Sequence, residues 1–369
     1  MVLKQIELQN FRLHKSTSLE FSDKLNLIVG GNGQGKTTIL EAIYYLCTTK
    51  NINLASDSDV ISFGEKFFST RGAFSQFTLN QNTVYYDLIK NKKTYFIDEK
   101  QETKATEIIG RFPVVTLTQS DHAITQGAPS ERRRFIDSVI TQSSKTYLEI
   151  LLDYSKTLRQ RSSLLSQIKE TRNSSLNSQL DSWTQTLIKN GSVIIGYRKK
   201  FVEEFIPFVK QAYLKVVEKY ENPKINYQTI TAAEDNVEEA FAKEIELVKE
   251  EEIRRGINLI CPHRDDYMFF VNDKELKRFG SQGQHKTFQI ALRFAQFFFM
   301  KEKLGKTPIF LMDDIFGELD SFRANKISTY LEEIGQAFIT MTDLTKKEVL
   351  KINHGNKIIE VVNGKTTYA

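Results

Sequence analysis

The chain is poor in the residues that stabilise small secreted domains and in the long apolar runs of membrane proteins. Its 369 residues include two cysteines, Cys47 and Cys261, too few for a disulfide framework or a four-cysteine zinc site. The longest aromatic run, residues 297–300, is far below the ~20 apolar residues that cross a bilayer. Residues 1–10 lack the basic stretch and apolar core of a signal peptide. These absences predict a cytoplasmic protein with no membrane partner.

Acidic and basic residues nearly balance. Lys and Arg number 51 and Asp and Glu 46, which gives a formal net charge of +5. That excess is compatible with a polyanionic partner but identifies none. Hydrophobic residues make up 40% of the chain, so it can bury a substantial core and is expected to divide into two or three lobes.

Residues 25–46 have the pattern of a buried strand, a glycine-rich loop and a helix. The loop at residues 30–37 matches G-x-x-x-x-G-K-[ST], the phosphate-binding P-loop. Backbone N–H groups of such a loop surround phosphate oxygens, while Lys36 can reach the β- and γ-phosphates of ATP and Thr37 can ligate Mg²⁺. A glycine-rich structural turn is the alternative. The expected ATP-binding residues are Gly30, Gly31, Asn32, Gly33, Gln34, Gly35, Lys36, Thr37 and Thr38.

A second apolar run, residues 308–312, leads into Asp313 and Asp314. A buried strand that ends in two acids can hold a metal ion beside bound phosphates. We expect Asp313 to contact Mg²⁺ and Asp314 to polarise the water that attacks the γ-phosphate. A buried strand that ends in an ordinary Asx turn would have the same pattern.

Residues 280–284 resemble the signature loop of ABC ATPases, which completes the nucleotide site of a partner subunit. Ser281, Gly283, Gln284 and the following helix N-terminus could then bind a γ-phosphate across an interface. A polar loop that caps a helix is the alternative. The same resemblance implies a metal contact for Gln119, near the Q-loop position, and a switch role for Thr342, where ABC proteins usually have His.

The pattern of strands and helices predicts an α/β fold with an insertion. Residues 67–98 are expected to form an antiparallel β meander, with turns at 80–82 and 90–93. Apolar residues then recur at helical spacing up to Gly256, and the Ser- and Asn-rich residues 171–178 are expected to reverse a helical hairpin. We therefore expect an ABC-type ATPase head, with a P-loop core and β meander, from residues 1–130 and 257–369, and a helical arm domain at 131–256.

Two further segments, residues 127–137 and 261–266, together with 279–284, resemble signatures of the RecF family of ABC/SMC-head ATPases. The resemblance spans the whole length. It implies an ATP-dependent homodimer with weak DNA-stimulated ATPase activity. It also implies binding to gapped or duplex DNA and help in loading RecA together with RecR-type and RecO-type mediator proteins. Gly31, Thr38 and Cys261 depart from the family's usual Pro, Asn and Gly, but none of them replaces Lys36 or a carboxylate.

Basic clusters offer candidate contacts to DNA phosphates. The residues concerned are Arg132, Arg133, Arg134, Arg198, Lys199 and Lys200. Charge runs on helices are also ordinary solvated faces.

Two other functions remain open: an SMC-like protein, although only about 125 residues separate the two halves of the head, and a non-repair ABC module that acts on a protein partner.

Overall fold

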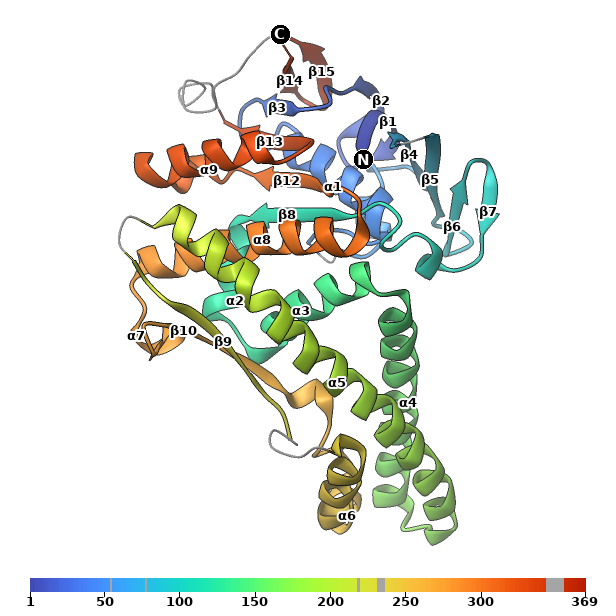
Figure 1. Cartoon of the computed structure of the whole chain (residues 1–369). Coiled ribbons are helices and arrows are strands. Elements are labelled where there is room, and N and C mark those ends of the chain that lie inside the picture. Colours follow the sequence, from blue (N-terminus) through green and yellow to red (C-terminus); the bar gives the residue numbers. More distant parts are fainter. Residues whose placement is uncertain (54, 77, 218–219, 231–235, 343–354) are drawn as a thin grey trace. The chain divides into compact units, whose positions relative to one another are not determined.

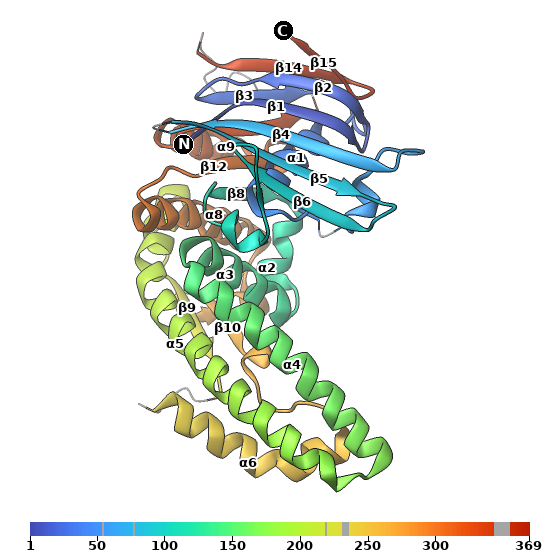
Figure 2. The ribbon, with the colours of Figure 1, turned by 90° about the vertical axis from the view of Figure 1, so that its right-hand side faces the viewer.

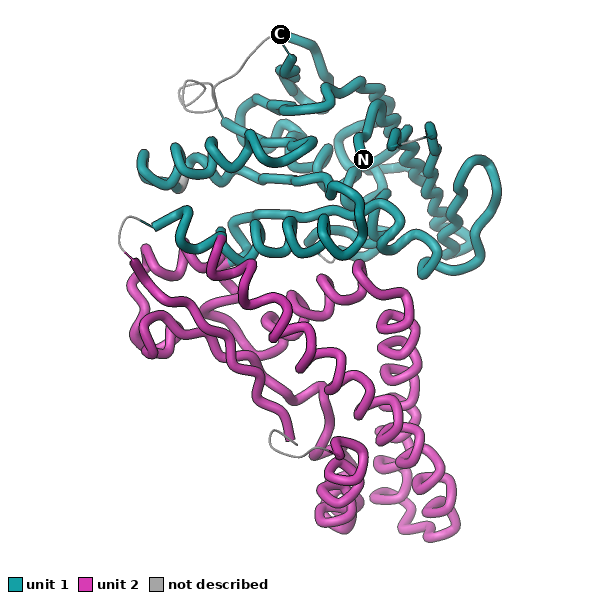
Figure 3. The backbone as a smooth tube through the Cα atoms, in the orientation of Figure 1, with its two compact units in different colours: residues 1–121, 212–219, 290–369 teal, residues 122–211, 220–289 magenta. Residues whose placement is uncertain are grey.

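The computed structural model describes residues 1–53, 55–76, 78–217, 220–230, 236–342 and 355–369. They form two compact units (Figure 3). Unit 1 comprises residues 1–121, 212–219 and 290–369, and unit 2 comprises residues 122–211 and 220–289. Residues 122–130 and 257–289 cluster with the helical segment, and residues 212–217 of the predicted arm cluster with unit 1. The predicted domain bounds of 1–130, 131–256 and 257–369 stay predictions. Among the described helices, none has the length and apolar character that crossing a membrane requires.

The first layer of unit 1 is a six-stranded, mainly parallel sheet (Figure 1). Its central strands are buried along their whole length, as expected where other elements cover both faces of a parallel sheet. In order across the sheet, the strands are β15 (Lys365–Tyr368), β14 (Lys357–Val362), β3 (Leu25–Val29), β13 (Ala337–Met341), β12 (Ile309–Asp313) and β8 (Val114–Thr118). Only β15 runs antiparallel to its neighbour.

The second layer is an antiparallel sheet, whose strands lie side by side in Figure 2. In order, they are β2 (His14–Glu20), β1 (Val2–Phe11), β4 (Phe67–Ser75), β5 (Leu79–Asp87), β6 (Lys92–Ile97) and β7 (Lys100–Glu102). Helix α1 (Lys36–Thr48) packs against strands of both sheets. Ile39, Ile43 and Leu46 of α1 belong to one continuous core with residues of both layers. The P-loop helix is therefore held inside the unit.

The predicted β meander is confirmed, but the turn expected at residues 80–82 is wrong. These residues lie inside β5, which begins at Leu79, while β4 ends at Ser75. The side-chain amide of Asn82 is buried and donates to the carbonyl of Leu46 in α1, 2.5 Å away. A polar side chain can occupy a buried strand when it is paired in this way.

Unit 2 is mainly helical. Its helices are α2 (His122–Gln126), α3 (Pro129–Ser143), α4 (Lys145–Thr171), α6 (Val237–Arg255) and α7 (Leu276–Phe279). Helices α5 (Asn177–Val216) and α8 (Gln282–Leu304) each contribute residues to both units, and α9 (Ser321–Glu333) belongs to unit 1. The predicted reversal between α4 and α5 is confirmed.

One strand of unit 2, β9, lies inside the segment that was expected to be helical. β9 (Pro223–Gln228) pairs with β10 (Asp266–Val271), which also pairs with the short β11 (Lys274–Glu275). Proline is acceptable at the first position of an edge strand. Pro223 therefore begins β9, while Pro207 lies within α5.

A fully buried ion pair joins α4 to α6. The guanidinium of Arg161 donates to the Glu252 carboxylate at 2.6 Å, and the two side chains are 1% and 0% exposed. The backbone N–H of Leu259 donates to the other Glu252 oxygen at 2.6 Å. Arg161 also donates to Thr184 of α5 at 2.9 Å. All three long helices of unit 2 thus meet at one charged group.

We predict that Glu252→Gln destabilises unit 2 by about 3–5 kcal/mol, because it leaves the Arg161 charge buried without a counter-ion. Trp183, the single tryptophan, packs on the apolar cluster of unit 2. Its fluorescence in a urea titration therefore reports unfolding of this unit. Glu251→Gln is the matched control, because Glu251 pairs with Arg254 and Arg255 at the surface. The urea midpoint of this variant should hardly differ from that of the wild type. Equal urea midpoints for the two variants would contradict the structural role of the buried pair between Arg161 and Glu252.

Candidate nucleotide-binding site

The P-loop follows β3 at the carboxyl edge of the parallel sheet. Gly33 and Gly35 have φ angles of 74° and 106°, a region that side chains with a Cβ rarely adopt. At Gly30, an added Cβ would lie 2.3 Å from the carbonyl oxygen of Val361. The loop therefore needs glycine for its backbone path and for its close approach to β14.

Neighbouring hairpins hold the loop from outside. The N–H groups of Asn363 and Gly364 donate to the side chain and the carbonyl of Gln34, at 2.6 and 2.9 Å. The His14 ring is buried, with Nε2 3.1 Å from the carbonyl oxygen of Gly35 and Nδ1 3.0 Å from the hydroxyl of Thr17. Burial lowers the pKa of His14, which favours the neutral ring. The P-loop is therefore preformed.

The ammonium group of Lys36 lies within this loop. It donates to the carbonyl oxygens of Gly30 and Gly31 at 2.6 and 2.8 Å. Burial lowers the pKa of Lys36, while the carboxylates of Asp314 and Asp313 act in the opposite direction. A cation held by neutral carbonyl groups is ready to interact with an incoming phosphate, which is a stronger, charged acceptor.

The two aspartates lie beside the P-loop helix, as predicted. Asp313 ends β12, and its Oδ1 accepts hydrogen bonds from the hydroxyls of Thr37 at 2.8 Å and Thr340 at 2.7 Å. Asp314 has a φ angle of 49°, and its N–H donates to the Thr340 hydroxyl at 2.9 Å. This left-handed conformation, uncommon outside glycine, sits at the point where function is expected.

The donor set at this point fits Mg²⁺. The Thr37 hydroxyl and the Asp313 carboxylate lie 2.8 Å apart, close to the roughly 3 Å between neighbouring ligands of an octahedral Mg²⁺. Throughout the described residues, no group of three or more His, Cys, Asp or Glu side chains could hold a metal ion by itself. Mg²⁺ commonly takes only one or two protein ligands and completes its shell with phosphates and water.

A cavity of about 650 Å³ opens beside the loop, a size suited to a nucleotide. Its lining includes seven residues that the sequence predicts for the ATP site: Asn32, Gly33, Gly35, Lys36, Thr37, Thr38 and Asp314. Thr340, which also lines the cavity, was not predicted. The rest of the lining was not predicted either; it comprises Arg12, Leu13, Lys15, Asp59, Ile61, Ser62 and Phe63. No phosphate-binding motif marks these segments, and only the fold brings them to the P-loop.

Gln119 and Thr342 are placed at the same edge of the sheet. Gln119 follows β8, whose last residue, Thr118, is the register partner of Asp313. Thr342 follows β13, which lies between β3 and β12. Both side chains are exposed. Their positions suit the predicted metal and switch roles, which remain predictions.

Ser281 caps helix α8 in unit 2. Its hydroxyl accepts a hydrogen bond from the Gln284 N–H at 3.2 Å, and the Gln284 side chain accepts one from the Ser281 N–H at 3.0 Å. This is a capping box. The alternative interpretation of the loop is thus present in the structure, yet Ser281 is exposed at a helix N-terminus, a position suited to anions. Gly283 and Gln284 form the first turn of the helix.

The prediction that Arg132 and Arg198 bind DNA is corrected. Arg132 is buried and makes a bidentate pair with Asp266, at 2.7 and 2.8 Å. Arg198 is also buried and pairs with Asp137 at 2.8 Å and Asp265 at 3.3 Å. Both guanidinium groups stabilise the interior of unit 2 and do not face solvent.

The remaining basic residues differ in how accessible they are. Arg133 is half-buried and donates to the carbonyl of Asp265. Arg134 is exposed beside Glu131, and Lys200 is exposed beside Glu204. Lys199 is partly exposed. These four residues stay DNA-binding predictions.

The fold and the site define an ATP-binding protein of the ABC class, with a P-loop, a strand that ends at Asp313 and is followed by Asp314, and a helix-capping loop that resembles the ABC signature. The RecF/RecN/SMC N-terminal domain family matches residues 2–367. A DNA replication and repair protein RecF from Chloroherpeton thalassium is 40% identical over 353 residues, covering 93% of this chain and 95% of that protein. The RecF of Salinibacter ruber is 33% identical over 350 residues, covering 93% and 85%. The chain belongs to the RecF family.

Solved structures agree with this assignment. The recombination mediator protein RecF-ATPrS of the RecFOR pathway matches with a TM-score of 0.91 and 28% identity, covering 99% of this chain and 97% of that one. A Smc head domain from Pyrococcus furiosus matches with a TM-score of 0.56 and 15% identity, which shows a shared fold alone. The RecF likeness therefore outweighs the SMC-like alternative.

We predict that Thr37→Ala lowers the affinity for ATP in the presence of Mg²⁺ by roughly 10- to 100-fold, the cost of other changes at metal sites. Most of the affinity that Mg²⁺ adds to ATP binding is then lost. Isothermal titration with ATP in Mg²⁺ and in EDTA measures this gain. Affinity in EDTA should stay near the wild-type value, and Thr37→Ser should restore the gain because it keeps the hydroxyl. An undiminished effect of Mg²⁺ in Thr37→Ala would count against Thr37 as a ligand.

Proposed function

We propose that this chain is a DNA replication and repair ATPase whose bound ATP joins two copies into a clamp on DNA. One observation carries the proposal: the Thr37 hydroxyl and the Asp313 carboxylate are already in contact beside Lys36. In ABC proteins, a nucleotide held in this way is completed by the signature loop of a second copy. Ser281 would supply that contact here.

The residues at the sheet edge have separate tasks in this proposal. Lys36 and the N-terminus of α1 bind and orient the triphosphate, and Thr37 and Asp313 hold Mg²⁺, with Gln119 as a further contact. Bound Mg²⁺ would neutralise charge on the β- and γ-phosphates. Asp314 orients a water molecule for attack on the γ-phosphorus and accepts its proton, and the bond to the ADP oxygen breaks. Thr342 would sense the γ-phosphate.

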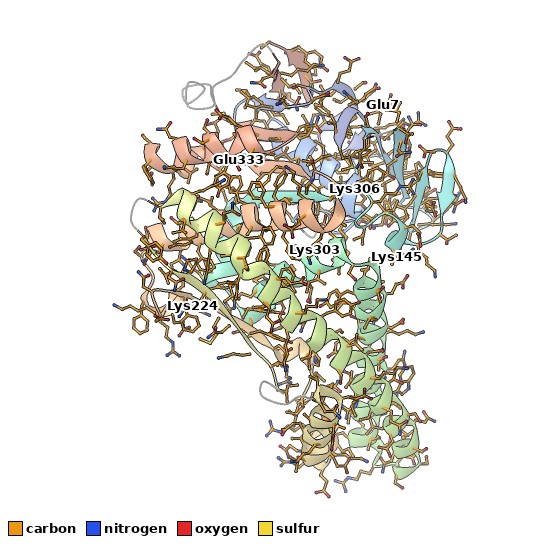
Figure 4. The ribbon with its side chains drawn as sticks, in the orientation of Figure 1. Glu7, Lys145, Lys224, Lys303, Lys306 and Glu333 are labelled. Carbon is orange, nitrogen blue, oxygen red and sulfur yellow. The ribbon has the colours of Figure 1, made fainter. Side chains whose placement is uncertain are left out.

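Nucleic acid and protein partners follow from family membership. We infer binding to gapped or duplex DNA, and cooperation with RecR-type and RecO-type mediators in RecA loading. Positive charge is spread over both units, and exposed lysines include Lys303 of unit 1 and Lys145 of unit 2 (Figure 4). Such dispersed charge is suited to contacts with the phosphate backbone, which position a protein without reading sequence.

We predict that Asp314→Asn with ATP and Mg²⁺ sediments as a dimer, because the clamp forms but hydrolysis is blocked. Adding Ser281→Asp should return it to a monomer. Aspartate is at least as good a helix cap as serine, so α8 stays intact, while its charge repels a γ-phosphate. Analytical ultracentrifugation with ADP as the reference distinguishes the two roles of Ser281. A Ser281→Asp double variant that still dimerises would show that Ser281 only caps the helix.

We predict slow ATP turnover that rises with duplex or gapped DNA and is lost in Lys36→Met.

Arg134→Ala should weaken duplex binding and lower the slope of log affinity against log salt by about 0.9, because the variant neutralises one phosphate fewer. Filter binding at several salt concentrations measures that slope, with Lys90→Ala as a control at an exposed basic position of unit 1, outside the predicted clusters. Turnover that ignores DNA, together with no duplex binding, would favour a module that acts on a protein partner.

A further inference from the structure

The loop that carries Ser281 is attached closely to the short helix α7. Gly280 joins the two: its N–H donates to the carbonyl of Leu276 at 2.8 Å, and an added Cβ would lie 2.5 Å from the same oxygen. On the other side, the Ser281 carbonyl accepts from the His285 N–H at 3.0 Å. Because the loop packs this closely on α7, the position of α7 sets the position of the Ser281 hydroxyl.

Helix α7 cannot fix its own position. It has four residues and follows the hairpin of β10 and β11 (Figure 1). A single helical turn is unstable by itself, so contacts outside α7 must hold it. Leu276 is buried, and α7 packs against α2 and β10. Two basic residues add polar contacts to this packing, Arg132 of α3 and Lys277 of α7 itself.

Both basic residues bind one carbonyl oxygen, that of Gly127, which follows α2. The guanidinium of Arg132 and the ammonium of Lys277 each donate to it at 3.0 Å. Charged donors make stronger hydrogen bonds than neutral ones. Arg132 also holds Asp266, the first residue of β10, through its bidentate pair. The hairpin is therefore held at its start through Arg132, and the helix that follows it is held through Lys277.

The shared acceptor is itself fixed. The Gly127 N–H donates to the carbonyl of Ala123 in α2 at 2.8 Å, and an added Cβ would lie 2.5 Å from that oxygen. Gly127, Arg132 and Asp266 belong to the two segments, residues 127–137 and 261–266, that resemble RecF signatures. Among the described residues that line the nucleotide cavity, none comes from either segment. The phosphate chemistry of the P-loop therefore does not account for them.

We propose that Arg132 and Lys277 are positioning residues, which hold the Ser281 loop through Gly127 where it meets the nucleotide of a second copy. The proposal rests on the ATP-dependent clamp proposed above. Neither side chain touches the nucleotide in this role. Lys277 is exposed, whereas Arg132 is buried with its partner. Replacing Lys277 therefore weakens the attachment of α7 without leaving an unpaired charge in the interior.

The test measures dimerisation in the Asp314→Asn background with ATP and Mg²⁺. Lys277→Met should weaken the dimer roughly 25-fold, because one hydrogen bond is worth about fivefold in an equilibrium constant and the symmetric dimer contains two loops. Lys277→Arg should restore the dimer because it keeps a charged donor. Analytical ultracentrifugation measures both effects. The urea midpoint reported by Trp183 should equal that of the Asp314→Asn parent.

Two controls separate this role from other effects of the substitution. In the dimer-blocked Ser281→Asp background, Lys277→Met should bind ATP with unchanged affinity in isothermal titration, because a single copy does not use its own Ser281 loop. Arg278→Met is the matched control for charge. Arg278 is the adjacent exposed cation of α7, but it pairs with Glu275, so its dimer should be as stable as that of the parent.

A double-mutant cycle with Asp266→Asn distinguishes positioning from direct contact between Lys277 and the second copy. Asp266→Asn should also weaken the dimer, because it loosens Arg132. Both substitutions then act through Gly127, so their combined effect should be smaller than the product of the two single effects. Effects that multiply would show that Lys277 contacts the second copy itself, which would overturn its positioning role.

The remaining outcomes are also distinct. An unchanged dimer in Lys277→Met would refute the role of Lys277, and equal losses in Lys277→Met and Arg278→Met would show that only the charge of α7 matters. A weaker dimer with a lower urea midpoint would mean that Lys277 contributes to folding alone. An Asp314→Asn parent that stays monomeric with ATP would refute the clamp, independently of α7.

Discussion

The Asp313 carboxylate is the point on which the nucleotide site depends. It accepts hydrogen bonds from Thr37, 276 positions away in the sequence, and from Thr340. Because β8, β12, β13 and β3 run parallel, their carboxyl ends meet at one edge, where the P-loop also begins. The sheet therefore brings the two ends of the chain together into one site, and the long insertion between them does not disturb its geometry.

Unit 2 shows how charge can be used for structure in a protein expected to bind a polyanion. Arg132, Arg161 and Arg198 are all buried and paired with carboxylates. Such pairs fix relative positions more than they add stability, because desolvation offsets much of their attraction. They tie α3, α4, α5 and α6 to the segment that leads into β10. A rigid unit of this kind can hold the Ser281 loop in a defined position.

Local sequence signals predicted the phosphate chemistry well. Gly30 to Thr37 and the pair Asp313 and Asp314 are short motifs whose chemistry depends on adjacent residues, so they could be identified without the fold. Features that depend on distant partners could not. β9 forms because β10, some 40 positions further on, offers it an edge, and residues 80–82 stay in β5 partly because α1 accepts the Asn82 amide. Burial of Arg132 and Arg198, and the cavity lining at Phe63, likewise arise from tertiary packing.

A structure of Asp314→Asn with ATP and Mg²⁺, determined by electron cryomicroscopy, tests the central claim most directly. The clamp predicts two copies facing each other, with the Ser281 hydroxyl of one within hydrogen-bonding distance of the γ-phosphate that Lys36 of the other holds. Two copies whose signature loops point away from the bound nucleotides, or a nucleotide-loaded single copy, would contradict it.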